Sequence, residues 1–235
     1  MKQQFTFKSI FLFLCLGIIS TTTYASHYYG SEITYNCLGG NQYEIIFTSY
    51  TDCSSIGSPN SVSVSLASAT CTNTNLSLNL VSGFPMDITP ICPTQTTSCN
   101  GGTGSIGIDK YEYRGTVTLA GGCSDWLISY NSCCRSNMVT NITNPSSYGT
   151  TITTFISNQG QTLCNSNPTF NNTHTPVICS GTILSINDFT ATDSDGDSLS
   201  YSFTAPYIGL YPGNPGPAPS DPPPYSTVSF VPPFS

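Results

Sequence analysis

The sequence has few charged residues, and basic residues are the scarcest. Of its 235 residues, 5 are Lys or Arg and 12 are Asp or Glu, which gives a charged fraction of 7% and a formal net charge of −7. An ordinary soluble domain has about 25% charged residues. Beyond residue 25 the basic side chains are Lys110, Arg114 and Arg135. Three cations are too few to neutralise a phosphate backbone, so we expect no nucleic-acid partner.

The sequence also lacks an apolar run long enough to span a membrane. The run from Ile10 to Ile19 is about half of the ~20 residues that a transmembrane helix needs. Lys2 and Lys8 flank the polar start before it, and Thr23-Tyr24-Ala25 follows with small residues suited to a cleavage site. This order is typical of a secretory signal peptide. We therefore predict a signal peptide at residues 1–25, no transmembrane segment after its removal, and a secreted or cell-surface protein.

Catalytic motifs are scarce. The two histidines are His27, beside the predicted mature terminus, and His174, in a loop-like stretch. No Gly-x-Ser-x-Gly or His-Glu-x-x-His motif occurs, although nucleophilic and acid–base catalysis need a group held beside a partner. We predict that the protein is not an enzyme. Glycosidases use carboxylates that are distant in sequence, so a hydrolase remains an alternative, with its acid pair drawn from Asp52, Asp109, Glu112 and Asp125.

Cysteine, by contrast, is abundant. Of eleven cysteines, Cys15 lies in the predicted signal peptide, which leaves an even number, as expected for disulfides in an exported chain. No Cys-x-x-Cys pair supports a zinc site. We expect Cys164 to pair with Cys179, and the adjacent Cys133 and Cys134, on one expected strand, to take different partners. The ten predicted disulfide cysteines are Cys37, Cys53, Cys71, Cys92, Cys99, Cys123, Cys133, Cys134, Cys164 and Cys179.

Alternation of apolar and polar residues is the main structural pattern, and it is typical of half-buried strands. A hairpin is expected around Leu38-Gly39-Gly40-Asn41. No stretch keeps the period of a helix. We predict an all-β, disulfide-linked fold with an Ig-like β-sandwich at residues 26–164. Its inward positions include Tyr43, Ile45, Phe47, Val62, Val64, Leu66, Leu76, Leu78, Leu80, Tyr111, Tyr113, Trp126, Ile128 and Tyr130.

A second region is expected after a boundary near Asn165-Ser166-Asn167-Pro168. We predict a partial Ig- or cadherin-like β domain at residues 165–235, whose short length indicates a fragment of a longer protein. Residues 206–233 form a proline-rich excursion, since proline cannot donate to a sheet ladder. Tyr207, Tyr211 and Tyr225 in this excursion are the predicted exposed binding surface. The expected strands are Val177-Ile178, Ile183 to Ile186, Leu199 to Phe203 and Val228 to Val231.

Three aspartates surround a glycine in this second region. Asp193, Asp195 and Asp197 alternate around Gly196, which allows the chain to curl. Carboxylate oxygens are ligands that Ca²⁺ prefers, so these three residues form a candidate calcium site, which would need further oxygen ligands. The alternative is a tight acidic turn in which the Asp side chains cap their own backbone amides.

The order of several motifs resembles the N-terminal region of large surface proteins of Bacteroidota. The residues concerned are Tyr29-Gly30-Ser31-Glu32-Ile33-Thr34-Tyr35, Leu38-Gly39-Gly40-Asn41-Gln42-Tyr43, Tyr50-Thr51-Asp52-Cys53, Cys133-Cys134-Arg135-Ser136-Asn137, Leu163-Cys164-Asn165-Ser166-Asn167-Pro168 and Ala191-Thr192-Asp193-Ser194-Asp195-Gly196-Asp197. The last is similar to a motif of cadherin-like repeats. The resemblance implies a surface protein of the type that often continues into PKD or Ig-like repeats and a gliding-motility-associated C-terminal sorting domain.

We therefore predict a non-enzymatic adhesion or binding module for an extracellular glycan or protein. The alternatives are a calcium-stiffened spacer or cap of a longer surface protein, and a glycan-active hydrolase.

Overall fold

The structure is a computed structural model that describes residues 28–53, 57–89, 91, 96–104, 107–135, 139–156, 164–171, 190–209 and 225–233. The predicted signal peptide lies outside the described residues. So do Cys92, Cys179, His174, Tyr211 and the expected strands at Val177-Ile178 and Ile183 to Ile186. In the part of the chain that is described, no helix has the length and apolar character needed to cross a membrane.

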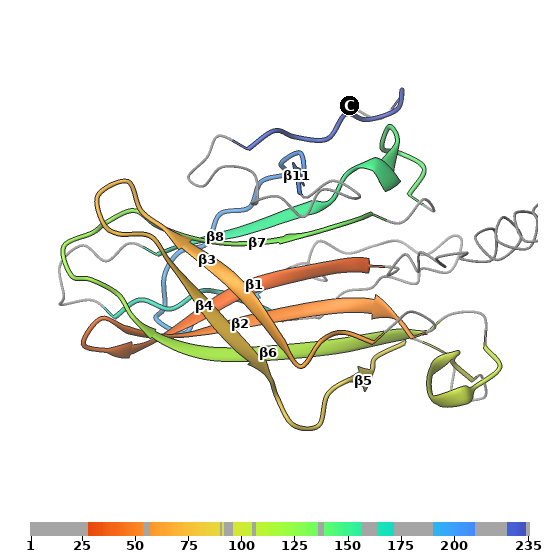
Figure 1. The fold of residues 1–235 in the computed structure, drawn as a ribbon, viewed down its shortest axis with the longest axis horizontal. Helices are drawn as coiled ribbons and strands as arrows, with labels where there is room; N and C mark the ends of the chain where they lie inside the picture. Colours follow the sequence, from red (N-terminus) through yellow and green to blue (C-terminus); the bar gives the residue numbers. More distant parts are fainter. Residues whose placement is uncertain are drawn as a thin grey trace, which may run out of the picture.

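Among the described residues, strands make up the regular structure, apart from two short 3₁₀ turns (Figure 1). The long strands begin and end where the alternating pattern does, because period-2 alternation places one row of side chains inside and the other outside. The elements are β1 (Tyr28–Gly39), β2 (Gln42–Asp52), β3 (Ser61–Ala67), β4 (Thr74–Leu80), β5 (Met86–Asp87), η1 (Cys99–Gly101), β6 (Ile108–Thr118), β7 (Trp126–Ser132), η2 (Pro145–Ser147), β8 (Thr150–Ile156), β9 (Thr169–Phe170), β10 (Ala191–Thr192) and β11 (Tyr207–Ile208).

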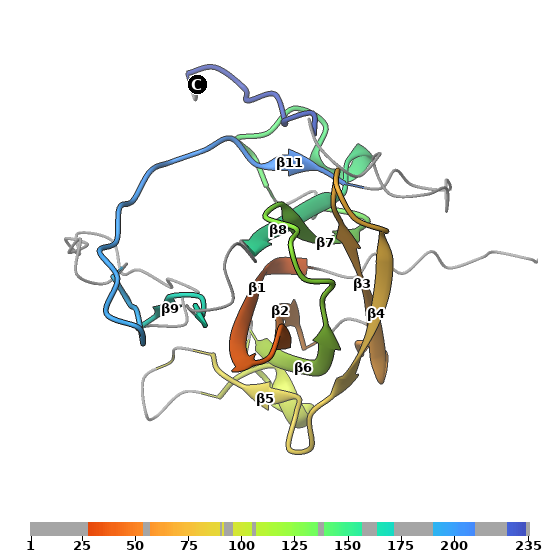
Figure 2. The same cartoon turned by 90° about the vertical axis from the view of Figure 1, so that its left-hand side faces the viewer.

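One antiparallel sheet forms most of the molecule. Its strand order is β1-β2-β6-β4-β3-β7-β8-β11, and β5 pairs with β6. The sheet curls so that its strands surround a common interior (Figure 2). The curl brings β1 next to β8, where the Tyr35 hydroxyl of β1 donates to the Phe155 carbonyl of β8, at 3.4 Å. The all-β prediction is therefore confirmed in the form of one curled antiparallel sheet, and the Ig-like sandwich stays a prediction.

The core lies inside this curl and matches the alternation in the sequence. Ile45, Leu66, Leu78, Tyr113 and Ile128 have no exposed surface. Tyr111 and Trp126 are buried with them, as predicted. The hairpin between β1 and β2 also confirms the prediction, and the positive φ angles of Gly39, Gly40 and Asn41 explain why glycine and asparagine stand there.

Eight of the ten predicted disulfide cysteines are paired in the structure. Two predictions about their partners are wrong. Cys164 pairs with Cys37, with a Cα–Cα distance of 5.4 Å, because the chain after β8 returns along β1. Cys133 and Cys134 pair with each other: β7 ends at Ser132, so the opposite-face rule for strand residues does not apply to them. The other pairs are Cys53–Cys99 and Cys71–Cys123.

Short stretches from the predicted second region pack on the large sheet. β11 pairs with β8, and the Val228 amide donates to the Pro206 carbonyl at 3.0 Å. β9 and β10 form a separate two-stranded sheet. The strand expected at Leu199 to Phe203 is not formed, and the Phe203 side chain is fully exposed; no strand of the described residues pairs with this segment. The boundary near residue 165 stays a prediction.

Candidate functional site

The three aspartates of the candidate calcium site lie on an exposed turn that follows β10. The Asp193 carboxylate accepts hydrogen bonds from the amides of Asp195 and Asp197, at 2.9 and 3.1 Å. Asp195 accepts one from the Ser166 amide at 2.7 Å. Gly196 has φ +84°, as a tight turn of this kind needs. These are the self-capping contacts of an acidic turn, and calcium binding stays a prediction.

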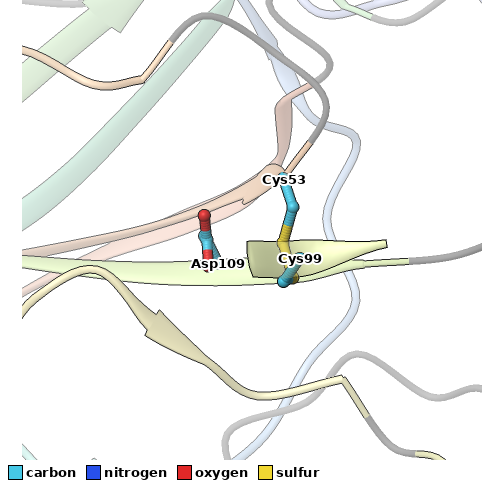
Figure 3. Close-up of side chains that lie close together, drawn as sticks. All are labelled: Cys53, Cys99 and Asp109. Carbon is cyan, nitrogen blue, oxygen red and sulfur yellow. A yellow bond between two sulfur atoms is a disulfide. The ribbon is translucent and has the colours of Figure 1, made fainter. Parts of the chain in front are cut away.

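One cluster of potential metal ligands occurs among the described residues, and its chemistry does not suit a metal. Cys53, Cys99 and Asp109 have ligand atoms within 4.8 Å of one another. Figure 3 shows the two sulfurs joined in a disulfide beside the Asp109 carboxylate. A disulfide sulfur is not a thiolate, and the thiolate is the form of cysteine that binds metals. Burial and the nearby Asp87 raise the pKa of Asp109.

The tyrosines predicted as an exposed binding surface are not exposed together. Tyr225 is buried, so the prediction is wrong for that residue. Its ring packs on the partly buried Tyr207, with centroids 5.3 Å apart. The reason is tertiary: Tyr207 lies in β11, which pairs with β8, and Thr227 near the end of the proline-rich excursion forms a bridge with Tyr207. Tyr211 lies outside the described residues.

The carboxylates considered for a hydrolase have structural contacts. Glu112 forms ion pairs with Lys110 and Arg114, at 3.7 and 2.8 Å. Asp125 lies directly before β7 and accepts hydrogen bonds from Ser68 and Thr70, which follow β3. Asp52 accepts one from the exposed Tyr29 hydroxyl at 3.3 Å.

A cavity of about 310 Å³ lies inside the curled sheet, at the end where β1 and β3 begin and β2 and β7 end. This is the right-hand end in Figure 1, towards which the arrowhead of β2 points. The size is at the lower limit of known ligand pockets. The cavity is lined by Tyr28, Phe47, Ser49, Thr51, Gly57, Ser58, Pro59, Val62, Tyr113, Tyr130 and Ser132.

The interior changes from apolar to polar along two strands that reach this cavity. The inward row of β2 runs from Ile45 and Phe47 to Ser49 and Thr51. The inward row of β7 ends in the same way at Ser132. Ser49 and Thr51 are only 4% and 6% exposed. Burial of a hydroxyl group costs free energy unless the group finds a hydrogen-bond partner. A polar interior at this point therefore indicates a candidate ligand site.

The tyrosine hydroxyls of the cavity are neutral at ordinary pH. Tyr113 donates to the Pro59 carbonyl at 2.9 Å, and burial raises the pKa of Tyr113 to about 12. Burial also raises the pKa of Tyr28, which donates to the Ser31 hydroxyl, and of Tyr130. No Asp, Glu, Lys, Arg or His is among the eleven lining residues. The described cavity wall is therefore uncharged, with aromatic rings and hydroxyl groups.

The cavity contains none of the tyrosines predicted as the binding surface, which were Tyr207, Tyr211 and Tyr225. Tyr113 was predicted as a core residue, as observed. The available indication of the cavity was the change from apolar to hydroxyl side chains at the ends of two alternating rows, in β2 and β7. That pattern alone does not show that the hydroxyl-bearing ends of the β2 and β7 rows face the same cavity.

The disulfides fit a chain that folds in an oxidising compartment, because disulfides rarely persist in the cytosol. Comparisons with protein-family models, curated proteins and solved structures found no match to the chain.

Proposed function

We propose that the chain is a secreted or cell-surface binding module that holds a neutral, hydroxyl-bearing group, such as a sugar ring of a glycan, in the cavity beside Tyr28. The observation that carries this proposal is the uncharged cavity in which Ser49 and Thr51 are buried on the inner face of β2. Sugar rings have apolar faces and hydroxyl edges. Aromatic rings pack against the former, and hydroxyl groups can bond to the latter.

The proposal is for binding without catalysis. Glycoside hydrolysis needs two carboxyl groups beside the scissile bond, and the described cavity wall contains none. Glu112 and Asp125 support the fold through ion pairs and hydrogen bonds. The resemblance to surface proteins of Bacteroidota supports an extracellular location and remains part of the proposal.

A glycan array followed by calorimetry with the best glycan tests the proposal, with Thr51→Val as the decisive variant. Valine keeps the shape of the side chain and removes its hydroxyl, so affinity should fall by about threefold to tenfold for one lost hydrogen bond. Thr48→Val is the matched control, because Thr48 is also buried on β2 but projects from the other face. Its affinity should equal that of the wild type.

Two results would contradict the proposal. One is the absence of any glycan that binds, which would favour the structural spacer. The other is an equal effect of Thr51→Val and Thr48→Val on affinity, which would place the glycan elsewhere. Release of reducing sugar during incubation would instead support the hydrolase alternative.

A further inference from the structure

Arg135 differs from the other basic residues that the structure describes. Lys110 forms an ion pair with Glu112, and Arg114 forms ion pairs with Glu44 and Glu112, at 3.2 and 2.8 Å. Arg135 has no carboxylate partner among the described residues. Among the described residues, the guanidinium of Arg135 is thus the one basic group whose positive charge is not paired with a carboxylate.

The guanidinium of Arg135 is held in place but incompletely bonded. Its Nη2 atom donates to the Tyr207 carbonyl at 2.9 Å, and its backbone amide donates to the Tyr148 carbonyl at 3.0 Å. Its Nε atom is buried and has no acceptor among the described residues. A buried donor without an acceptor is rare and costs free energy, more so on a charged group. A bound anion is one physical reason to keep such a donor.

Arg135 also lies next to the cavity. Its backbone forms a bridge with Tyr28, and it follows Ser132 by three residues. Tyr28 and Ser132 both line the cavity. The guanidinium is near enough to the Tyr28 hydroxyl to oppose the rise in its pKa. A ligand ring in the cavity could therefore place an attached anionic group at the guanidinium.

We infer that Arg135 forms an anion subsite beside the cavity, and that the ligand is an acidic sugar whose carboxylate pairs with its guanidinium. The inference rests on the proposed function, because the cavity holds the ring. The planar fork of an arginine matches a carboxylate in two parallel hydrogen bonds. The chain as a whole is negatively charged, at −7, so general electrostatic attraction would not produce a preference for acidic glycans.

The test compares an oligosaccharide that ends in glucuronic acid with its carboxyl-reduced counterpart, which ends in glucose. The wild type should bind the acidic form at least about tenfold more tightly, as expected for a charge-assisted hydrogen bond. Arg135→Gln should remove this preference and leave the affinity for the neutral form unchanged. Arg135→Lys, which keeps the charge but not the fork, should retain part of it.

Arg114→Gln is the matched control, because Arg114 is already paired with carboxylates and should not affect the preference. Equal affinities of the wild type for the two glycans, or a preference that survives in Arg135→Gln, would overturn the anion subsite while leaving the cavity proposal in place. If neither glycan binds, the anion subsite fails, and the glycan array decides separately whether the cavity proposal holds. Circular dichroism of each variant shows whether it is folded. If Arg135→Gln is unfolded, the preference measured with Arg135→Lys decides whether Arg135 forms the anion subsite.

Discussion

Tyr113 supports the cavity with its phenol group. The residue is wholly buried, and its hydroxyl bonds to the Pro59 carbonyl in the loop before β3. Tyr113→Phe should lower the free energy of unfolding by about 1 kcal/mol, the usual value for one hydrogen bond. Urea denaturation at pH 7 measures this loss. Tyr111→Phe is the control, because Tyr111 is buried on the same face of β6 and no hydrogen bond of its hydroxyl is found among the described residues.

The raised pKa of Tyr113 also predicts a dependence on alkaline pH. A phenol that ionises near pH 10 in the unfolded chain and near 12 in the folded one favours folding fully below about pH 10. That contribution is lost as the pH rises towards about 12. Tyr113→Phe should therefore lose less stability between pH 9 and pH 11 than the wild type, in the same urea experiment. An equal loss would show that the Tyr113 phenol does not control this range.

Asp125 should make the stability of the fold depend on pH in the acidic range. Its carboxylate accepts hydrogen bonds from the Ser68 and Thr70 hydroxyls and from the Ala69 amide, at 2.7 to 2.8 Å, and these bonds lower the pKa of Asp125. Its contribution to stability is present above the unfolded pKa of about 3.9 and lost as the pH falls below it.

Asp125→Asn should therefore lower the melting temperature at pH 7 and show a weaker decrease between pH 5 and pH 3 than the wild type. Thermal melts over this range measure both effects. A variant whose melting curve follows that of the wild type at every pH would contradict the assignment.

Disulfides of different loop length should differ in their effect on stability. Cys37–Cys164 closes a loop of 127 residues, for which the chain-entropy model gives about 5 kcal/mol. Cys133–Cys134 joins neighbours and constrains almost none of the unfolded chain. Replacing Cys37 and Cys164 with serine should cost several kcal/mol, and replacing Cys133 and Cys134 should cost much less. Chemical denaturation of the two double variants tests this, and equal losses would contradict it.

The turn after β10 is the element on which calcium binding can be decided. Asp193 and Asp195 already accept three backbone hydrogen bonds, and no other hydrogen bond to the carboxylates of Asp193, Asp195 and Asp197 is found among the described residues. We expect about 10 mM calcium to raise the melting temperature, because a ligand that binds the folded state stabilises it. Asp195→Ala should abolish the calcium-dependent shift. If the wild type melts at the same temperature with and without calcium, the turn does not bind calcium and is stabilised by its hydrogen bonds.

For the molecule as a whole, the disulfide framework predicts complete oxidation. Ten cysteines follow the predicted signal peptide, and the structure pairs eight of them. Thiol titration of the denatured, unreduced protein should find no free thiol, and peptide mapping should recover the four pairs. Four or more titratable thiols, or a peptide that links Cys164 to Cys179, would contradict the framework.

Local patterns were enough to predict the strands and the core. Alternation along β2, β3, β6 and β7 depends only on the two-residue period of a strand, so the burial of Phe47, Leu66, Tyr113 and Ile128 could be predicted without knowing what they contact. The hairpin after β1 was predictable for a similar reason, since its glycines determine the turn. The even number of cysteines after residue 25 was likewise sufficient to predict disulfides, whereas export of the chain stays a prediction.

Contacts between distant segments required the folded structure. The partner of Cys164 lies 127 residues away, and only the return of the chain along β1 makes that pair possible. Tyr225 is buried because β11 joins β8, whereas Leu199 to Phe203 alternates like a strand but pairs with no strand in the described part of the chain. The cavity forms where Tyr28, Ser49 and Ser132 meet from three strands. Periodicity determines which face of a strand is inward, but the pairing of strands determines which inward residues share a space.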